Sequence, residues 1–441
     1  MTFGRILAIA AGRVCAPGRA AAFLLLLLVG ACTQGPYTID LMPVPVIYED
    51  GTIDPFAGDR RIDESRHPGI FYATLRPPAE ADGPPYYLDQ RGDVLRLGRA
   101  RVSMGVEGMT WRDAATVSLQ KDRPADYKLH VESIEEFGVL GETVTPFSDP
   151  ALRDAPEAIG DRRFLDALES ELADSRQRDI FIFVHGYKVP FSDPALVAAE
   201  LWHFLGYEGA FIAFSWPSTP SAWAYFADSN TASVSAYGFR KFLRFLARES
   251  SVRRIHILGY SAGTGLVTQT LHQMALLARN AKDPGSVASN KLGHVVLLGS
   301  DVDRNLMGVY LDDHLMSVIE SLEIYLSDTD FALDTSAWIF GGRRTGQMWA
   351  EGEMKPAVKE YLLGQDDIRL IDVTDAEGAA TGNGHGYFRK SPWASSDILF
   401  LLRYGTHPAG RGLIRNEGEP VWNFPPDYPD RVQEKLKDIE Q

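Results

Sequence analysis

The sequence contains only two cysteines, Cys15 and Cys32, among 441 residues. Such a chain has no disulfide framework, so its stability has to come from a hydrophobic core. Basic residues are also outnumbered, because 44 Lys and Arg face 59 Asp and Glu, for a formal net charge of −15. This balance argues against nucleic acid and anionic membrane surfaces as partners. The sequence also lacks an internal repeat, which excludes the repeat architectures.

Long apolar runs are scarce as well, and the most conspicuous one lies near the N-terminus, at 20–29. It is too short for a permanent membrane span but suits the core of a signal peptide. The segment that follows, Val29-Gly30-Ala31-Cys32, resembles the bacterial lipobox, which predicts a signal peptide over 1–31 and lipidation of Cys32. The same resemblance implies sorting to the outer membrane of a Gram-negative cell envelope, facing the periplasm, because Thr33 rather than Asp follows the cysteine. The alternative is an ordinary secretory signal followed by a stray cysteine.

Two further parts precede the main body of the chain. Residues 32–69 are rich in proline and predict an extended tether. Residues 70–140 form a β-rich section, either the antiparallel start of a sheet or a separate small cap. The expected strands there are Phe71–Leu75, Val94–Gly98, Arg101–Met104 and Tyr127–Val131.

Over 141–407 the pattern alternates between continuous apolar runs and helix-like stretches. This rhythm predicts an α/β fold, with a doubly wound, mostly parallel sheet and helices on both of its faces. The expected strands are Ile180–Val184, Ala210–Phe214, Arg254–Leu258, His294–Leu298, Leu322–Leu326 and Ile368–Val373. The expected helices are Ala195–Leu205, Ser235–Arg248, Leu266–Ala278, Leu315–Glu320, Ala357–Leu363 and Ser396–Leu402. We expect residues 408–441 to form a peripheral tail.

The most informative segment is Gly259-Tyr260-Ser261-Ala262-Gly263, a G-x-S-x-G pattern between an expected strand and an expected helix. This context predicts a nucleophile elbow, in which a tight strand-to-helix turn exposes the serine hydroxyl. On its own the pattern is also compatible with a simple glycine-rich turn. With a strand before it and a helix after it, Ser261 becomes the candidate nucleophile of an α/β-hydrolase fold.

A serine nucleophile needs a base, and in this fold an acid and then a histidine follow the serine along the chain. Asp330, on the exit loop of a later strand, is the favoured acid, with Asp301 and Asp303 as alternatives. His385 lies in a glycine-flanked loop and is favoured over His407 as the base. Loop aspartates most often cap helices or form turns, which is the plain alternative for each of them.

The negative charge that develops on the substrate oxygen needs two preorganised N–H donors. We expect them from Ala262, directly after the serine, and from Tyr187 in the strand-ending segment Val184-His185-Gly186-Tyr187. A cluster of aromatic residues after the next strand is expected either to line an acyl pocket or to serve ordinary packing; it comprises Trp216, Trp223, Tyr225 and Phe226. The paired aspartates lack further oxygen ligands at a suitable spacing, so we expect neither a metal nor an organic cofactor.

Taken together, these segments resemble a bacterial α/β-hydrolase family of unknown function that is related to lipases and esterases. The matching segments are Val184-His185-Gly186-Tyr187, Ser215-Trp216-Pro217-Ser218, Gly259–Gly263, Tyr325–Leu333 and Gly384–Phe388. The resemblance covers Phe71 to Leu402 and implies Ser261 as nucleophile, Asp330 as acid and His385 as base. Two residues depart from the family pattern in the oxyanion loop: Lys188 replaces the usual Asn, and Pro190 stands where a small residue is common.

The sequence therefore predicts a lipid-anchored serine hydrolase that cleaves carboxylic esters of small molecules or lipids through an acyl-enzyme intermediate. Two alternatives stay open. The same triad could pass the acyl group to an acceptor, which would make the protein an acyltransferase. The chain could also be a non-catalytic envelope lipoprotein that binds ligands or partners on a hydrolase scaffold, since a fold does not fix a function.

Overall fold

We describe a computed structural model of the chain, which places residues 36–57, 69–80, 83–106, 108–218, 225–279, 291–340, 342–350 and 352–440. The side chains of 225–230, 338–340 and 440 are left out of the description. The chain divides into two units, Met1–Pro36 and Tyr37–Gln441. The predicted signal peptide and Cys32 lie outside the described residues, and everything below concerns the second unit.

The second unit is built on one twelve-stranded sheet with the strand order β1-β4-β3-β2-β6-β5-β7-β8-β9-β10-β12-β11. Neighbouring strands run parallel from β2 to β12, and antiparallel pairs extend the sheet at both edges. The strands are β1 Thr38–Asp40, β2 Ile70–Thr74, β3 Arg96–Met104, β4 Lys128–Val139, β5 Asp179–Val184, β6 Ala210–Ser215, β7 Arg254–Tyr260, β8 Leu292–Leu298, β9 Ser321–Leu326, β10 Ile368–Asp372, β11 Ile414–Arg415 and β12 Val421–Asn423.

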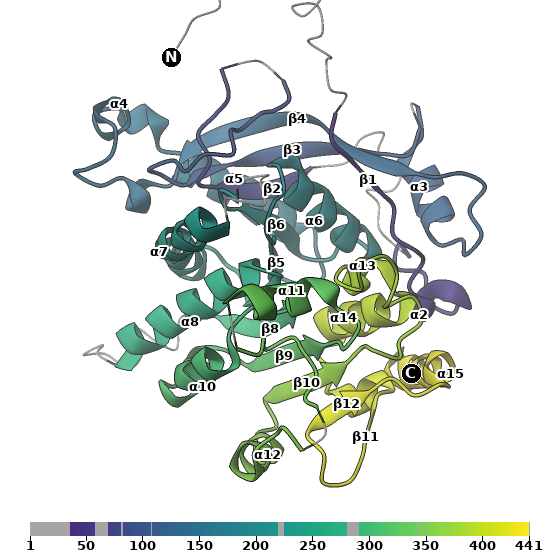
Figure 1. Cartoon of the computed structure of the whole chain (residues 1–441). Helices are drawn as coiled ribbons and strands as arrows, with labels where there is room; N and C mark the ends of the chain where they lie inside the picture. The colour runs from purple at the N-terminus through teal and green to yellow at the C-terminus, as the bar shows by residue number, and fades with distance from the viewer. Residues whose placement is uncertain are drawn as a thin grey trace, which may run out of the picture. The chain divides into compact units, whose positions relative to one another are not determined.

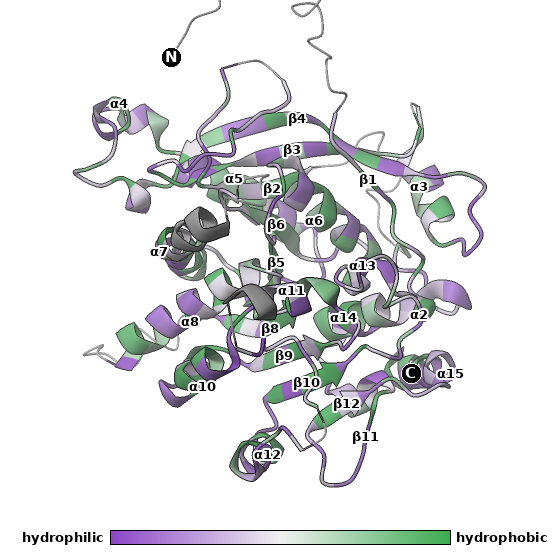
Figure 2. Cartoon of the chain, in the orientation of Figure 1, coloured by the Kyte–Doolittle hydropathy of each residue, from purple (hydrophilic) through white to green (hydrophobic). Residues whose placement is uncertain are grey.

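Alternate residues of the central strands pack into two different hydrophobic cores. On β5, for example, Phe181 and Phe183 belong to one core, whereas Ile180, Ile182 and Val184 belong to the other. Side chains of a strand alternate between the two faces of a sheet, so each face carries its own core. Burial on both faces explains why these strands are mostly apolar, as Figure 2 shows for the middle of the sheet.

Helices cover both faces of the sheet (Figure 1). The core that contains Phe181 is covered by α2 Val46–Glu49, α3 Trp111–Ser118, α6 Ser192–Phe204, α13 Tyr387–Lys390, α14 Pro392–Tyr404 and α15 Tyr428–Glu440. The opposite core is covered by α5 Asp161–Ala173, α7 Tyr225–Glu249, α8 Gly263–Arg279, α10 Arg304–Asp312 and α12 Pro356–Leu363. Two further helices, α4 Pro150–Arg153 and α11 Phe331–Phe340, lie in connections between strands. The predicted doubly wound α/β architecture is confirmed.

The β-rich section belongs to this same sheet rather than to a separate cap. Strand β2 pairs in parallel with β6 and antiparallel with β3, so it joins the antiparallel edge to the parallel centre. Two strands expected from the sequence, at 94–98 and 101–104, form the single strand β3. In another difference, the expected helix at 315–320 is a 3₁₀ turn over Leu315–Val318.

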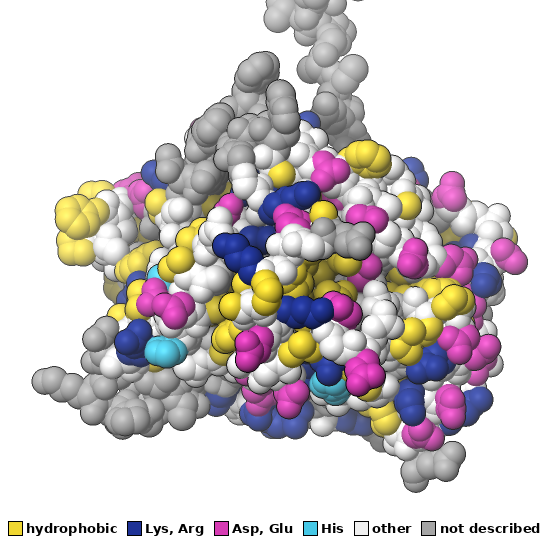
Figure 3. All heavy atoms as spheres, turned by 60° about the horizontal axis from the view of Figure 1, so that its bottom comes forward, with side chains coloured by type: hydrophobic (Ala, Val, Ile, Leu, Met, Phe, Trp, Pro, Cys, Tyr) yellow, Lys and Arg dark blue, Asp and Glu magenta, His cyan; other side chains and the backbone are white. Residues whose placement is uncertain are grey.

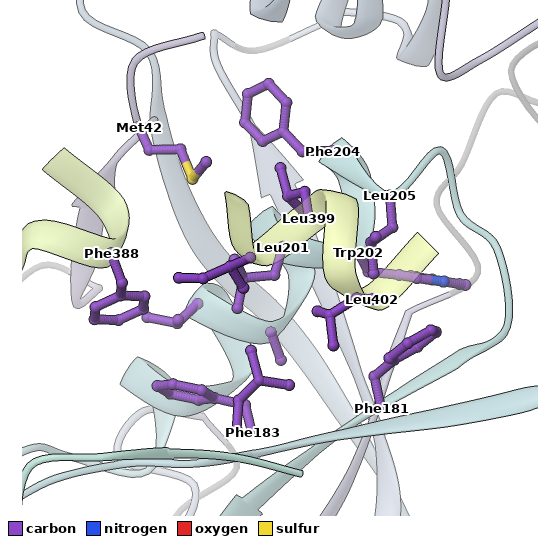
Figure 4. Packing of buried hydrophobic residues seen from close by; sticks show 14 of the residues in the cluster. Met42, Phe181, Phe183, Leu201, Trp202, Phe204, Leu205, Phe388, Leu399 and Leu402 are labelled. Atoms are coloured by element: carbon purple, nitrogen blue, oxygen red, sulfur yellow. The ribbon is translucent and has the colours of Figure 1, made fainter. Parts of the chain in front are cut away.

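The segment expected to be an extended tether is built into the domain where the structure describes it. Strand β1 pairs antiparallel with β4, and Met42 packs with side chains of α6 and α14, as Figure 4 shows. The N–H of Met42 also donates to the buried Glu200 carboxylate over 2.6 Å. The expectation of a tether is therefore wrong for residues 37–57. Proline spacing signalled an extended backbone but did not reveal that the apolar residues between the prolines would be buried.

The C-terminal segment is likewise more than a peripheral tail. Strand β12 pairs in parallel with β10, and α15 buries Tyr428, Val432 and Leu436. Arg411, which is fully buried, donates to Asp397 on α14 over 2.6 Å. These contacts extend the sheet beyond the boundary expected at residue 407. No helix among the described residues is long and apolar enough to cross a membrane.

Candidate active site

The G-x-S-x-G segment lies at the carboxyl end of β7, in the middle of the parallel sheet. Ser261 has a φ of +53°, a left-handed conformation that is uncommon for a residue with a side chain. Its N–H donates to the Leu298 carbonyl at the end of β8 over 2.9 Å, and its carbonyl accepts from the Thr264 N–H over 2.9 Å. These bonds fix a sharp turn from strand to helix, with α8 starting at Gly263. The serine side chain remains partly exposed, as a nucleophile requires.

The elbow packs directly against the loop that follows β5. A methyl group on Gly263 would lie 2.3 Å from the carbonyl oxygen of His185, so a larger residue would force the two backbones apart. A methyl group on Gly186 would lie 2.7 Å from the Cβ of Ser261. The structure therefore brings the segment that contains Tyr187 to the serine. Ala262 follows the serine directly and precedes the first turn of α8.

Asp330 and His385, which are 55 residues apart, form a buried pair in which Nδ1 of the imidazole lies 2.7 Å from Oδ2 of the carboxylate. The other carboxylate oxygen accepts the N–H groups of Ala332 and Leu333 over 3.1 and 3.2 Å at the start of α11. Asp330 thus caps a helix and holds the histidine at the same time. A carboxylate held in this way fixes the orientation of the imidazole ring.

The loops that carry the acid and the histidine are joined through their backbones. Gly384 has a φ of +69°, and a methyl group there would lie 2.1 Å from the Thr329 carbonyl oxygen. Asn383 accepts from the His385 N–H through its side chain over 3.3 Å and from the Phe331 N–H through its carbonyl over 3.2 Å. The glycine next to His385 is therefore needed for close approach of the two loops.

The histidine also lies beside the elbow. Its ring centroid is 4.9 Å from that of Tyr260, the residue before the serine. A methyl group on Gly299, next to the Leu298 carbonyl that accepts from Ser261, would lie 2.8 Å from Cε1 of His385. Nε2 of His385 is buried and makes no hydrogen bond to the residues that the structure describes. This is the nitrogen that would accept the serine proton, a contact that often tightens only when substrate binds.

The two departures in the oxyanion loop have a clear conformational setting. Lys188 has a φ of +68°, in the left-handed region that asparagine adopts more readily than other residues with a side chain. An Asn would therefore adopt this conformation with less strain than the lysine. Pro190 lies at the entrance to α6, where its carbonyl accepts from the Asp193 N–H over 3.2 Å. Both residues fit a loop that still contacts the serine.

The alternative acids and base have other partners. Asp303 caps α10 by accepting from the N–H groups of Asn305 and Leu306. Asp301 accepts from the Ser336 hydroxyl over 2.5 Å and lies 3.4 Å from the Arg344 guanidinium. His407 accepts from the Ala409 N–H, and its ring lies edge-on to Trp422. Of the acids considered, Asp330 is the one the structure pairs with His385.

Sequence reasoning did not assign a role to Tyr387, which lies two residues after the histidine. Its hydroxyl accepts from the Gly299 N–H over 2.6 Å and donates to the Tyr325 carbonyl over 3.4 Å. Burial raises the pKa of this phenol well above its ordinary value. The hydroxyl therefore stays protonated and ties the ends of β8 and β9 together beneath the histidine. Its place in the Gly384–Phe388 motif was the available signal.

Of the aromatic cluster after β6, Trp216 is fully described and is buried against His185. Trp223 and the side chains of Tyr225 and Phe226 lie outside the described residues. A separate cavity of about 1000 Å³ opens between α10 and α12 over β9 and β10. Figure 3 shows the face that carries α12, with a hollow lined by hydrophobic side chains and bordered by charged ones. None of the predicted site residues lines this cavity.

A comparison with models of protein families identifies the family of the chain. Residues 162–401 match the model described as "Alpha/beta hydrolase of unknown function (DUF900)". The chain belongs to this family. The matched region runs from α5 to α14 and so includes the elbow, the acid and the histidine. Membership in DUF900 supports hydrolase activity, while the family itself leaves the reaction and the substrate open. A comparison with curated protein sequences gave no match.

The DUF900 region offers no evident metal site in the part of the chain that is described. No group of three or more His, Cys, Asp or Glu side chains is placed there to hold an ion.

Proposed function

We propose that the protein is a serine hydrolase that cleaves carboxylic esters, with Ser261 as nucleophile, His385 as base and Asp330 as the acid. The observation that carries this proposal is the buried Asp330–His385 pair, at 2.7 Å, beside a serine in a strained strand-to-helix turn. A serine is a weak nucleophile until a base removes its proton. An aspartate, a histidine and a serine on the loops that follow three strands of the sheet would supply that base and its orientation.

In the proposed reaction, Nε2 of His385 takes the proton of Ser261 as the hydroxyl oxygen attacks the ester carbonyl. Asp330 holds the proton on Nδ1 and stabilises the imidazolium that forms. The N–H groups of Ala262 and Tyr187 hold the oxyanion until the alcohol leaves with the proton from His385. Water then attacks the acyl-serine with His385 again as base, which releases the acid and restores the enzyme.

The test is labelling by a fluorescent fluorophosphonate, which reacts with activated serines. We expect the wild-type chain to be labelled and the label to map to Ser261 by peptide mass spectrometry. The Ser261→Ala variant should fold normally, by circular dichroism, and remain unlabelled. An unlabelled but folded wild-type chain would argue for the binding-scaffold alternative. Product analysis with an added alcohol acceptor would separate hydrolysis from acyl transfer.

We also propose that Cys32 is lipidated and anchors the protein in the cell envelope, with the catalytic unit on the periplasmic side of the outer membrane. The proposal is supported by the Val29–Cys32 segment after an apolar run with preceding arginines. Metabolic labelling with an alkyne palmitate should mark the wild-type chain but not a Cys32→Ala variant. Equal labelling of both variants would exclude Cys32 as the modified residue.

A further inference from the structure

A fully buried guanidinium lies behind the loop that connects β5 to α6. Arg76 follows β2 by two residues and is 0% exposed. It donates to the Val189 carbonyl over 2.9 Å and pairs with the Asp89 carboxylate. Burying a charge is unfavourable unless its partners compensate for the lost hydration. The burial of the Arg76 guanidinium therefore suggests that the position of this loop is important.

Trp216, at the exit of β6, contacts the same loop from a second side. Its indole N–H donates to the His185 carbonyl over 2.7 Å. Its ring stacks on the His185 imidazole, with centroids 5.3 Å apart and planes 9° from parallel. Burial and the nearby Arg76 charge lower the pKa of His185 to about 3, so the ring is neutral. Its Nδ1–H then donates to the Gly186 carbonyl over 2.7 Å.

Ser218 supplies a third contact. Its hydroxyl lies 3.4 Å from the Val189 N–H and 3.3 Å from the Val189 carbonyl oxygen, and Nη2 of Arg76 lies 3.5 Å away. The strands that carry these residues are joined as well, because the Thr74 hydroxyl donates to the Ser215 carbonyl over 2.7 Å. Arg76, Trp216 and Ser218 thus come from two adjacent strand ends and converge on residues 185–189. We call these three residues the loop brace.

We propose that the loop brace positions the second oxyanion donor by holding residues 185–189 against Ser261. This inference rests on the proposed serine hydrolase function. Between the end of β5 and the start of α6 the segment has no helix or strand of its own, and Lys188 adopts a left-handed φ. Its position relative to Ser261 therefore depends on bonds from outside the loop. The proposal also assigns a role to the Ser215-Trp216-Pro217-Ser218 motif, because two of its side chains, Trp216 and Ser218, position the loop.

The test uses variants that each remove one contact of the loop brace. Trp216→Phe retains a ring on His185 but loses the N–H donor, and Ser218→Ala loses the hydroxyl. Arg76→Lys retains the charge, but a lysine lacks the planar guanidinium whose separate nitrogens bond to Asp89 and Val189 at the same time. The matched control is Arg99→Lys, on β3, where a half-buried arginine pairs with Glu171 over 2.7 Å, away from the loop.

Two readouts are measured on each variant: the second-order rate constant for fluorophosphonate labelling of Ser261, and the amide hydrogen exchange of peptides covering 185–190. Misplacing a group by about 1 Å can cost on the order of 100-fold in rate, and losing an oxyanion donor costs about 100- to 1000-fold. We therefore expect labelling to slow by about 10- to 100-fold in Trp216→Phe and Arg76→Lys, with faster exchange confined to the loop. Arg99→Lys should change neither readout.

The outcomes separate this inference from the proposed function. Labelling of the wild type together with unchanged labelling in the folded loop-brace variants would overturn the inference and leave the serine hydrolase standing. Absence of labelling in the wild type would remove the proposed function, and with it the oxyanion role. If Arg76→Lys fails to fold, Trp216→Phe and Ser218→Ala decide the question, and unchanged loop exchange in both would overturn the brace itself.

Discussion

Acid should destabilise this protein through histidines that are buried in the neutral form. Burial lowers the pKa of His185, His203 and His294 to about 3, compared with 6.5 in an unfolded chain. Above about pH 6.5 each is neutral in both states and contributes no pH dependence. Between about pH 6.5 and 3 the unfolded chain binds protons that the native state does not, so stability falls as the pH falls.

A single such histidine contributes about 1 kcal/mol per pH unit between pH 6 and 5, because one pKa unit corresponds to about 1.4 kcal/mol and the unfolded group is mostly protonated there. The three together contribute about 3 to 4 kcal/mol over that interval. Carboxylates whose pKa is raised by burial, such as Asp193 and Asp397, act in the opposite direction. The contribution of one histidine is therefore best measured as a difference between variant and wild type.

His203 is the best choice for that measurement. It is fully buried, and its Nδ1 and Nε2 form hydrogen bonds with the Tyr207 hydroxyl at 2.5 Å and the Ser118 hydroxyl at 2.7 Å. The nearby Arg123 charge also lowers its pKa. We expect urea unfolding of His203→Gln at pH 6.0, 5.5 and 5.0 to give a slope of stability against pH that is smaller by about 1 kcal/mol per unit. Tyr207→Phe, which removes a hydrogen bond but no histidine, should lower stability without changing the slope between about pH 6 and 5. An unchanged slope in His203→Gln would refute the assignment of a neutral buried histidine.

Three further predictions concern the site and its support. Asp330→Asn should slow fluorophosphonate labelling by up to about 10⁴-fold while the fold is retained, because an amide no longer holds the reactive tautomer of His385; labelling at the wild-type rate would exclude Asp330 as the acid. Lys188→Asn should raise the free energy of unfolding, measured by urea denaturation, by up to about 1 kcal/mol without slowing labelling, since Asn tolerates a φ of +68° better than Lys. Arg411→Met should cost about 3 to 5 kcal/mol, because it leaves the buried Asp397 without its guanidinium partner, whereas Glu323 keeps its pair with Arg369. In contrast, Arg163→Met, which breaks an exposed pair with Glu135, should cost under about 1 kcal/mol in the same assay.

The parallel centre of the fold was predictable because its strands are buried on both faces. Continuous apolar runs such as 180–184 and 210–214 carry that signal in every residue, and the observed strands β5 and β6 match them closely. The edges were harder to predict. Strand β1 and strand β12 have three residues each, and their pairing depends on partners far away in sequence. Such short strands form because the sheet already presents an edge, which no local pattern reveals.

The pairing of Asp330 with His385 was predictable for a related reason. Glycine-flanked Ser261 and His385 follow strands, and strand order restricts which acid can meet them. The supporting residues were not found, because their roles depend on contacts between strand ends. Arg76 reads in the sequence as an ordinary basic residue after a short strand, and nothing nearby in sequence predicts its burial. Its partners, Val189 and Ser218, lie 113 and 142 residues further along the chain.

These contacts also show that the proposed catalytic residues and the loop brace come from different strands of the sheet. The serine, the acid and the histidine lie on loops after β7, β9 and β10, whereas the loop brace comes from the ends of β2 and β6. Since β5 lies between β6 and β7, the loop that follows β5 is held by the brace on one side and contacts Ser261 on the other. A change in the brace should therefore alter the oxyanion side of the site and leave the Asp330–His385 pair intact. An Asp330→Asn and Trp216→Phe double variant tests this separation: if the two sides act independently, the two losses in labelling rate should multiply.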